Sequence, residues 1–297
     1  MQRFFFVLLT WLLSPSAVIA ADPGYKPMNN PVGPQSWWWD NTWWDEGQIP
    51  LPSNHSVETR WIEYPNDDTE VPAMIARPAD QRPYPAVLYL HGRRGLDELI
   101  QAQVKRLAAR GFVVLAPDLF SGRFIEKLPI EHDYDIEKDA AAGLDVLLAL
   151  PDISTQKACI ASQTRGGYIS LKAATSHRKQ KNGIACYVAW YPHLQDPNAP
   201  EPMQVYRYAT EVDQLEIPVL IFIGDQEQYQ RRRSIETAVQ SLQDAGKEVR
   251  LIVYPGVGRG FDFRPPAVRT LADDLAAQDA LMRAKRFIES NLVDAAR

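Results

Sequence analysis

Residues 157–168 read KACIASQTRGGY, and this stretch decides the fold that the sequence predicts. It begins with a short apolar run of the kind that forms a buried strand, and the pair Gly166-Gly167 then opens a run with helical spacing. A strand that passes through a sharp turn into a helix forms a nucleophile elbow, in which the turn exposes one side chain. Thr164 stands at the apex of this turn. The stretch therefore predicts an α/β protein with a functional edge beside Thr164.

The rest of the chain from residue 57 repeats the alternation of strand-like and helix-like runs. Two runs at 57–64 and 71–77, joined through 66–68, predict an antiparallel hairpin. Strand-like runs then occur at 86–90, 112–116, 157–161, 184–190, 219–223 and 250–254, and helical spacing fits 96–110, 136–150, 165–175, 230–245 and 273–291. Buried strands that alternate with helices predict a mostly parallel central sheet, with the hairpin at its start and helices on both faces.

Composition favours one large domain and disfavours a nucleic-acid partner. The 297 residues are 45% hydrophobic, which is enough for one sizeable core, and the net charge of −5 implies no domain-wide basic surface. We assign residues 57–297 to this domain. No spacing of His, Asp and Glu resembles a metal-ligand set, so we expect neither a metal nor a cofactor.

The first 56 residues form two segments outside this domain. A basic start, a short apolar run at 4–13 and small residues up to Ala20 predict a signal peptide over residues 1–20, cleaved near Ala20. The sequence thus predicts a periplasmic or secreted protein with no transmembrane segment after cleavage, and an uncleaved membrane anchor is the alternative. Export would allow a disulfide between Cys159 and Cys186, but both lie in strand-like apolar runs and we expect buried thiols.

Residues 21–56 form a Trp- and Pro-rich arm with no helical or strand periodicity. Five tryptophans crowd into its middle: Trp37, Trp38, Trp39, Trp43 and Trp44. Tryptophan is enriched at interface anchors, so the arm could dock on a partner protein. The arm could instead pack on its own domain, and sugar stacking or membrane contact are further alternatives. No lysine or arginine lies among these tryptophans, which argues against binding to anionic lipid.

Functional side chains in such a sheet lie just past the carboxyl ends of the strands. Four loops meet this condition: HGRRG at 91–95, SQTRGG at 162–167, GDQEQY at 224–229 and YPGVGRGFDFR at 254–264. Together with the stretch LYLHGRRGLDELIQAQVKRLAARGFVVLAPDLFSGR at 88–123, these motifs resemble the dienelactone hydrolase family of α/β-hydrolases. The resemblance covers residues 57–292. It implies an α/β-hydrolase fold, with a nucleophile, an acid and a histidine base on the last three loops.

The chain departs from the family pattern at all three of these positions. The family elbow, Gly-x-Cys/Ser-x-Gly-Gly, places Thr164 at the nucleophile, and the acid loop places Glu227 where the family usually has Asp. The base loop, YPGxGHGF in the family, places Arg259 at the histidine. A guanidinium has no acceptor nitrogen, so Arg259 cannot take the proton of a hydroxyl. We therefore expect an inactive acyl-transfer site in which Glu227 and Arg259 form a salt bridge.

The sequence leaves two features of this site open. A β-branched residue is disfavoured at the positive φ of an elbow, so the turn at Thr164 could be relaxed and its hydroxyl misdirected. His193 follows the strand-like run at 184–190, and it could be either a displaced base or an ordinary loop histidine. With such a base, the chain would be a slow or altered carboxylester or lactone hydrolase that uses Thr164.

Arginines gather on the same loops. The resemblance places Arg93 and Arg165 on the oxyanion loop, and Arg94 and Arg264 lie near enough in the predicted fold to bind a carboxylate or phosphate. The alternative is that the arginines pair with the nearby carboxylates of Asp97, Asp118, Glu227 and Asp262. The sequence thus predicts an exported, hydrolase-like protein without acyl-transfer activity. It would bind a small anion, or a partner protein through the Trp-rich arm.

Overall fold

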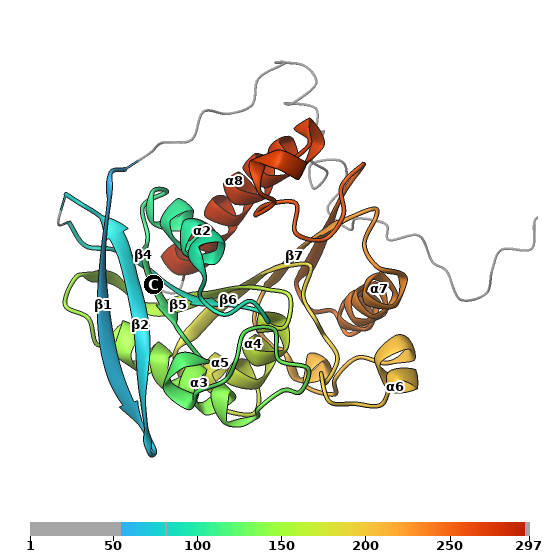
Figure 1. The fold of residues 1–297 in the computed structure, drawn as a ribbon, viewed down its shortest axis with the longest axis horizontal. Helices are drawn as coiled ribbons and strands as arrows, with labels where there is room; N and C mark the ends of the chain where they lie inside the picture. The colour runs from blue at the N-terminus through green and yellow to red at the C-terminus, as the bar shows by residue number, and fades with distance from the viewer. Residues whose placement is uncertain (1–54, 81, 295–297) are drawn as a thin grey trace, which may run out of the picture.

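The computed structural model describes residues 55–80 and 82–294, which form one sheet with helices on both faces (Figure 1). The eight strands are β1 (Val57–Asn66), β2 (Thr69–Pro78), β3 (Tyr84–Leu90), β4 (Val113–Pro117), β5 (Ile153–Gln163), β6 (Ile184–Trp190), β7 (Val219–Gly224) and β8 (Val249–Tyr254). Their order in the sheet is β1-β2-β4-β3-β5-β6-β7-β8. Strand β2 pairs antiparallel with β1 and β4, and all other pairs are parallel.

Within the described part of the chain, two helices cover one face of the sheet and the other helices lie on the opposite face or at its edge. The helices are α2 (Glu98–Ala108), α3 (Asp135–Leu148), α4 (Gly166–Ala174), α5 (Lys179–Asn182), α6 (Glu201–Tyr206), α7 (Tyr229–Asp244) and α8 (Leu271–Asp294), with 3-10 turns η2 (Ser121–Arg123), η3 (Val212–Gln214) and η4 (Pro266–Val268). Helices α2 and α8 lie side by side on one face, whereas α3 and α4 pack together on the other (Figure 1). The core between these layers consists of strand residues with almost no exposure, as in β4, whose five residues are all buried.

This architecture confirms the predicted sheet, hairpin and helix layers. The hairpin pairs Tyr64 with Val71, and the strand at 184–190 has the predicted bounds. The sequence did not predict α5 and α6, because four and six residues are too few to show a helical period.

The prediction of two buried thiols was wrong. Cys159 and Cys186 form a disulfide, with 4.6 Å between their α-carbons. They are direct neighbours in register on the parallel strands β5 and β6. The sequence could not show this neighbourhood, because it depends on the register between two strands.

The predicted signal peptide and the Trp-rich part of the arm lie in residues 1–54, outside the described residues. Within the described parts, no helix has both the length and the apolar surface needed to cross a membrane.

Candidate functional site

The turn after β5 is a fully formed elbow. Thr164 adopts φ 49°, in the left-handed region, and α4 begins two residues later at Gly166. The Thr164 carbonyl accepts hydrogen bonds from the N–H groups of Gly167 (3.0 Å) and His193 (2.7 Å), which hold the turn from both sides. The possibility that a β-branched residue relaxes this turn is therefore wrong. The surrounding contacts enforce a conformation that threonine disfavours on its own.

Glycines make room for the elbow. A β-carbon at Gly166 would lie 2.3 Å from the carbonyl oxygen of Leu90, so α4 approaches β3 more closely than any side chain allows. A β-carbon at Gly92 would lie 1.6 Å from the Thr164 hydroxyl oxygen. The hydroxyl therefore points at the loop after β3, where the resemblance places the oxyanion loop.

The base loop places Arg259 against Glu227, which confirms the predicted salt bridge. The Arg259 Nε lies 2.9 Å from the Glu227 Oε1, and the Glu227 carboxylate is fully buried. The same oxygen accepts the N–H of Gln228 at 2.8 Å. The Arg259 guanidinium also lies over the Tyr191 ring, 5.4 Å from its centroid, which is a cation–π contact.

The Arg259–Glu227 pair leaves several polar atoms without partners. Both terminal nitrogens of Arg259 and the second carboxylate oxygen of Glu227 are buried, and no described residue makes a hydrogen bond with them. Buried donors of this kind are costly unless a water or a ligand satisfies them. The site therefore holds unused donors.

Four arginines surround His193. Its ring is buried, and burial together with the charges of Arg259, Arg231, Arg165 and Arg93 holds its pKa well below the usual value for histidine. Burial and the other arginines also lower the pKa of Arg165 and of Arg231, each to about 10, so both stay charged at neutral pH. Glu227 is the only carboxylate that forms an ion pair with one of these four arginines among the described residues.

His193 is placed close to Thr164 but is poorly suited to act as a base. Its backbone N–H donates a hydrogen bond to the Thr164 carbonyl. No described residue, however, makes a hydrogen bond to the His193 ring or to the Thr164 hydroxyl. A general base works best with a pKa near the operating pH, and the pKa of His193 lies far below it. The imidazolium that forms on proton transfer would also face the four arginine charges.

The two arginines of the predicted oxyanion loop use their side chains to hold a neighbouring loop. Arg93 donates to the carbonyls of Leu128 and Pro129, and Arg165 donates to those of Pro129, Ile130 and Glu131 at 2.9–3.2 Å. Their backbone N–H groups, in contrast, donate to no described residue. One follows Gly92 and the other follows Thr164, so both N–H groups flank the Thr164 hydroxyl.

The structure removes Arg94 and Arg264 from the set of free cations. Arg94 pairs with Asp97 and stacks over the Phe263 ring, with its guanidinium carbon 5.8 Å from the ring centroid. Arg264 lies 3.6 Å from the carboxylate of Asp273. The predicted pairing with Asp97 is thus confirmed for Arg94, whereas Arg264 pairs with Asp273, a carboxylate that the sequence did not indicate.

Sequence reasoning missed Arg231. Arg231 lies in the run QRRRS at 230–234, is half-buried, and donates to the side chains of Gln195 (3.0 Å) and Gln204 (3.3 Å). Arg233, two residues further along the same helix, is exposed. The signal that could have identified Arg231 is its position in the first turn of α7, the helix that follows the acid loop.

His91 holds the loop that follows β3 in place. It is buried, its Nδ1 lies 2.8 Å from the Gly92 carbonyl, and its Nε2 accepts the N–H of Leu119 at 3.1 Å. Both ring nitrogens are therefore engaged. Across residues 55–80 and 82–294, no group of three His, Cys, Asp or Glu side chains could hold a metal ion.

Comparison with solved structures gives the fold of this chain. It superposes on a Klebsiella pneumoniae protein provisionally named a dienelactone hydrolase, with a TM-score of 0.63, 22% identity, and coverage of 79% of this chain and 99% of that one. It superposes on the bacterial heroin esterase with a TM-score of 0.62, 18% identity, and coverage of 82% and 88%. These similarities show the α/β-hydrolase fold.

Comparison of sequences gives the family. Two relatives, provisionally named carboxymethylenebutenolidases, come from Escherichia coli (strain K12) and Methylorubrum extorquens. The first is 29% identical and covers 74% of this chain and 84% of its own length; the second is 28% identical and covers 69% and 73%. The sequence profile described as the dienelactone hydrolase family matches residues 71–292. The chain belongs to the dienelactone hydrolase family.

Proposed function

We propose that this family member has no acyl-transfer activity and binds a small anionic ligand at the former active site. One observation carries the proposal. Arg259 occupies the place of the base and pairs with Glu227 through a single nitrogen, and its two terminal nitrogens have no hydrogen-bond partner among the described residues. The arrangement supplies donors and positive charge where catalysis would need a proton acceptor.

The chemistry of the three positions supports the loss of activity. A threonine hydroxyl is a poor nucleophile unless a base removes its proton. Arg259 offers only donors at the position of the base, because a guanidinium has no acceptor nitrogen, and its Nε is already paired with Glu227. Loss of one member of a triad leaves only the roughly 10³–10⁴-fold rate enhancement that the oxyanion hole and binding provide.

The surroundings of Thr164 support the binding of an anion. Four arginines face a single paired carboxylate, and two backbone N–H groups beside the hydroxyl have no acceptor among the described residues. The N-terminus of α4 adds its dipole at the same point, which also favours negative charge. Small carboxylates and phosphate esters match these donors, because guanidinium groups bind both through paired hydrogen bonds.

Ligand-dependent thermal stability tests this proposal. Inorganic phosphate and citrate should raise the melting temperature of the wild type, and Arg231→Gln should lose most of that rise because it removes one charge of the cluster. Arg233→Gln is the matched control, because Arg233 lies on the same helix but is exposed. A wild type that phosphate, citrate and similar anions fail to stabilise would contradict anion binding, as would equal losses in the two variants.

A slow hydrolase that uses Thr164 with His193 is the competing function, and the short connection between their backbones favours it. Hydrolysis of p-nitrophenyl acetate separates the two functions. We expect the wild type and Thr164→Ala to be equally inactive. Turnover by the wild type that disappears in Thr164→Ala would overturn the proposal of an inactive site.

We also propose that the protein is exported after cleavage near Ala20, with residues 57–297 as its single domain. The disulfide between Cys159 and Cys186 supports export, because such bonds persist mainly in oxidising compartments. Mass spectrometry of the protein from its host should find a chain that begins near Ala21 and lacks free thiols; an intact Met1 would contradict cleavage. Docking of a partner protein on the tryptophans of the arm stays a prediction, since these residues lie outside the described part.

A further inference from the structure

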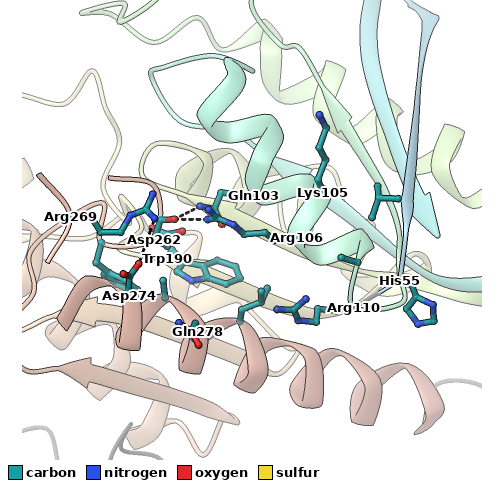
Figure 2. A pocket seen from close by; sticks show the side chains of 15 residues that line it. His55, Gln103, Lys105, Arg106, Arg110, Trp190, Asp262, Arg269, Asp274 and Gln278 are labelled. Carbon is teal, nitrogen blue, oxygen red and sulfur yellow. Dashed lines mark hydrogen bonds and ion pairs between the residues drawn. The ribbon is translucent and has the colours of Figure 1, made fainter. Parts of the chain in front are cut away.

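A groove between α2 and α8 is separate from the arginine cluster, which consists of Arg93, Arg165, Arg231 and Arg259. It has a volume of about 580 Å³, within the range of roughly 300–1,000 Å³ typical of ligand pockets (Figure 2). Helix α2 forms one wall and α8 the other, and Trp190 lies at the floor. Its lining includes His55, Lys105, Arg106, Trp190, Asp262 and Gln278.

The α2 wall of this groove is positively charged. Lys105, Arg106 and Arg110 lie on or just after this helix, and neither Lys105 nor Arg106 forms an ion pair with a described residue. Arg106 donates to the backbone carbonyl of Asp262 at 2.7 Å. Burial and the charge of Arg106 lower the pKa of Arg110. An occupant with negative charge would relieve this repulsion.

The floor of the groove is apolar, with one buried carboxyl group. Trp190 and Phe261 supply aromatic surface, and the Asp262 carboxyl accepts a hydrogen bond from the Tyr191 hydroxyl. Burial raises the pKa of Asp262 to about 6. A carboxylate at such a floor can accept a further hydrogen bond from the N–H of an indole, which is a donor only.

We propose that this groove receives the stretch Trp37–Glu46 of the same chain. The described chain begins at His55, which itself lines the groove. Trp44 precedes His55 by eleven residues, and an extended chain of that length spans at most about 40 Å. The stretch can therefore reach the groove without help from another molecule.

The chemistry of the stretch complements that of the groove. It reads WWWDNTWWDE, so its tryptophans alternate with the carboxylates of Asp40, Asp45 and Glu46. No lysine or arginine occurs between Lys26 and Arg60, so nothing in this part of the chain repels the α2 wall. The indoles match the aromatic floor, and the carboxylates match Lys105 and Arg106. This occupant does not depend on the ligand proposed for the arginine cluster.

Photo-crosslinking in the mature chain tests the location directly. With Trp43→p-benzoylphenylalanine, we expect intramolecular crosslinks to peptides of α2 and α8, identified by mass spectrometry. Trp61→p-benzoylphenylalanine is the control, because Trp61 is exposed on β1 and should not reach the groove. Crosslinks that map to other surfaces, to a second copy or to another protein, or a failure to crosslink, would overturn the proposal.

Charge substitutions at Gln278 test the complementarity. Gln278 is exposed, lines the groove from α8, and has no hydrogen-bond partner among the described residues, so neither change should affect the fold (Figure 2). Gln278→Glu should increase acrylamide quenching of tryptophan fluorescence, and Gln278→Lys should decrease it. Each should shift the docking equilibrium by up to about fivefold, and high salt should abolish the difference. Equal quenching of the two variants at low salt would contradict docking in this groove.

Discussion

The elbow at 162–168 and the base loop at 254–264 face the same site but depart from the family pattern in different ways. The elbow changes its nucleophile and keeps its backbone, with Thr164 at φ 49° and two glycines packed against neighbouring chain. The base loop changes the chemistry of the site, because Arg259 donates where a histidine would accept. The packing of the sheet against α4 dictates the backbone conformation of the elbow. In the base loop, the packing does not require a proton acceptor at position 259.

A glycine of the elbow should be the most sensitive position. Gly166→Ala places a β-carbon 2.3 Å from the Leu90 carbonyl oxygen and 2.8 Å from that of His91, both backbone atoms that cannot move alone. We expect a loss of at least about 3 kcal/mol in the free energy of unfolding, measured with urea.

Gly246→Ala is the control, because a β-carbon there meets nothing within 4 Å and only the φ of +70° is unfavourable. It should cost about 1 kcal/mol. Similar losses in the two variants would show that close packing does not hold the elbow.

If only chemistry was lost at the base loop, activity should be recoverable. Thr164→Ser with Arg259→His supplies an unbranched hydroxyl and an imidazole, and Glu227 can orient the imidazole. We expect p-nitrophenyl acetate hydrolysis to rise about 100-fold over the wild type, the lower end of what a general base contributes.

The control for this gain is Thr164→Ala with Arg259→His, which has the base and no nucleophile. If the two double variants hydrolyse the ester at the same rate, the elbow no longer aims its side chain at a substrate. The claim that the elbow has kept a functional backbone would then be contradicted.

Removal of one partner of the ion pair should reduce stability, because the charge of the other partner stays buried. Arg259→Met keeps packing on Tyr191 and leaves the Glu227 carboxylate buried without its partner. We expect a loss of about 2 kcal/mol, below the usual 3–5 kcal/mol for a broken buried pair because Arg231 lies near enough to compensate in part.

Adding Glu227→Met to Arg259→Met should restore most of that loss, because a pair of apolar residues leaves no buried charge. Urea unfolding of both variants measures the difference. A double variant that is less stable than Arg259→Met would show that the Glu227 carboxylate has a structural role beyond the pair.

The sequence predicted the parts of the site that follow from local pattern. The run KACIASQTRGGY shows a strand, a turn and a glycine-rich helix start, and the resemblance places Glu227 and Arg259 on adjacent loops. Arg231 escaped notice because three successive arginines look alike until the helix sets which one faces inward. The disulfide escaped for a similar reason, since it depends on the register of β5 against β6.

The smallest effect concerns the far side of the base loop, where Asp262 lies beneath the groove. Burial raises its pKa from the ordinary 3.8 to about 6, so between these pH values the folded chain holds a proton that the unfolded chain has lost. This group's contribution to stability is therefore full below pH 3.8 and is lost as the pH rises to about 6. Asp262→Asn keeps an acceptor for Tyr191 and removes the titration.

As the pH rises from 4 to 6.5, the free energy of unfolding of Asp262→Asn should increase relative to that of the wild type by about 1–2 kcal/mol. Urea unfolding of both proteins across that pH range measures the difference. His193 titrates in both proteins, so subtraction of the two curves removes its contribution. A difference that does not change with pH would mean that the Asp262 carboxyl is ionised throughout. Buried carboxylates would then lie on both sides of the base loop, at Glu227 and at Asp262. The floor of the groove would carry a negative charge at pH values where a pKa of about 6 keeps Asp262 neutral.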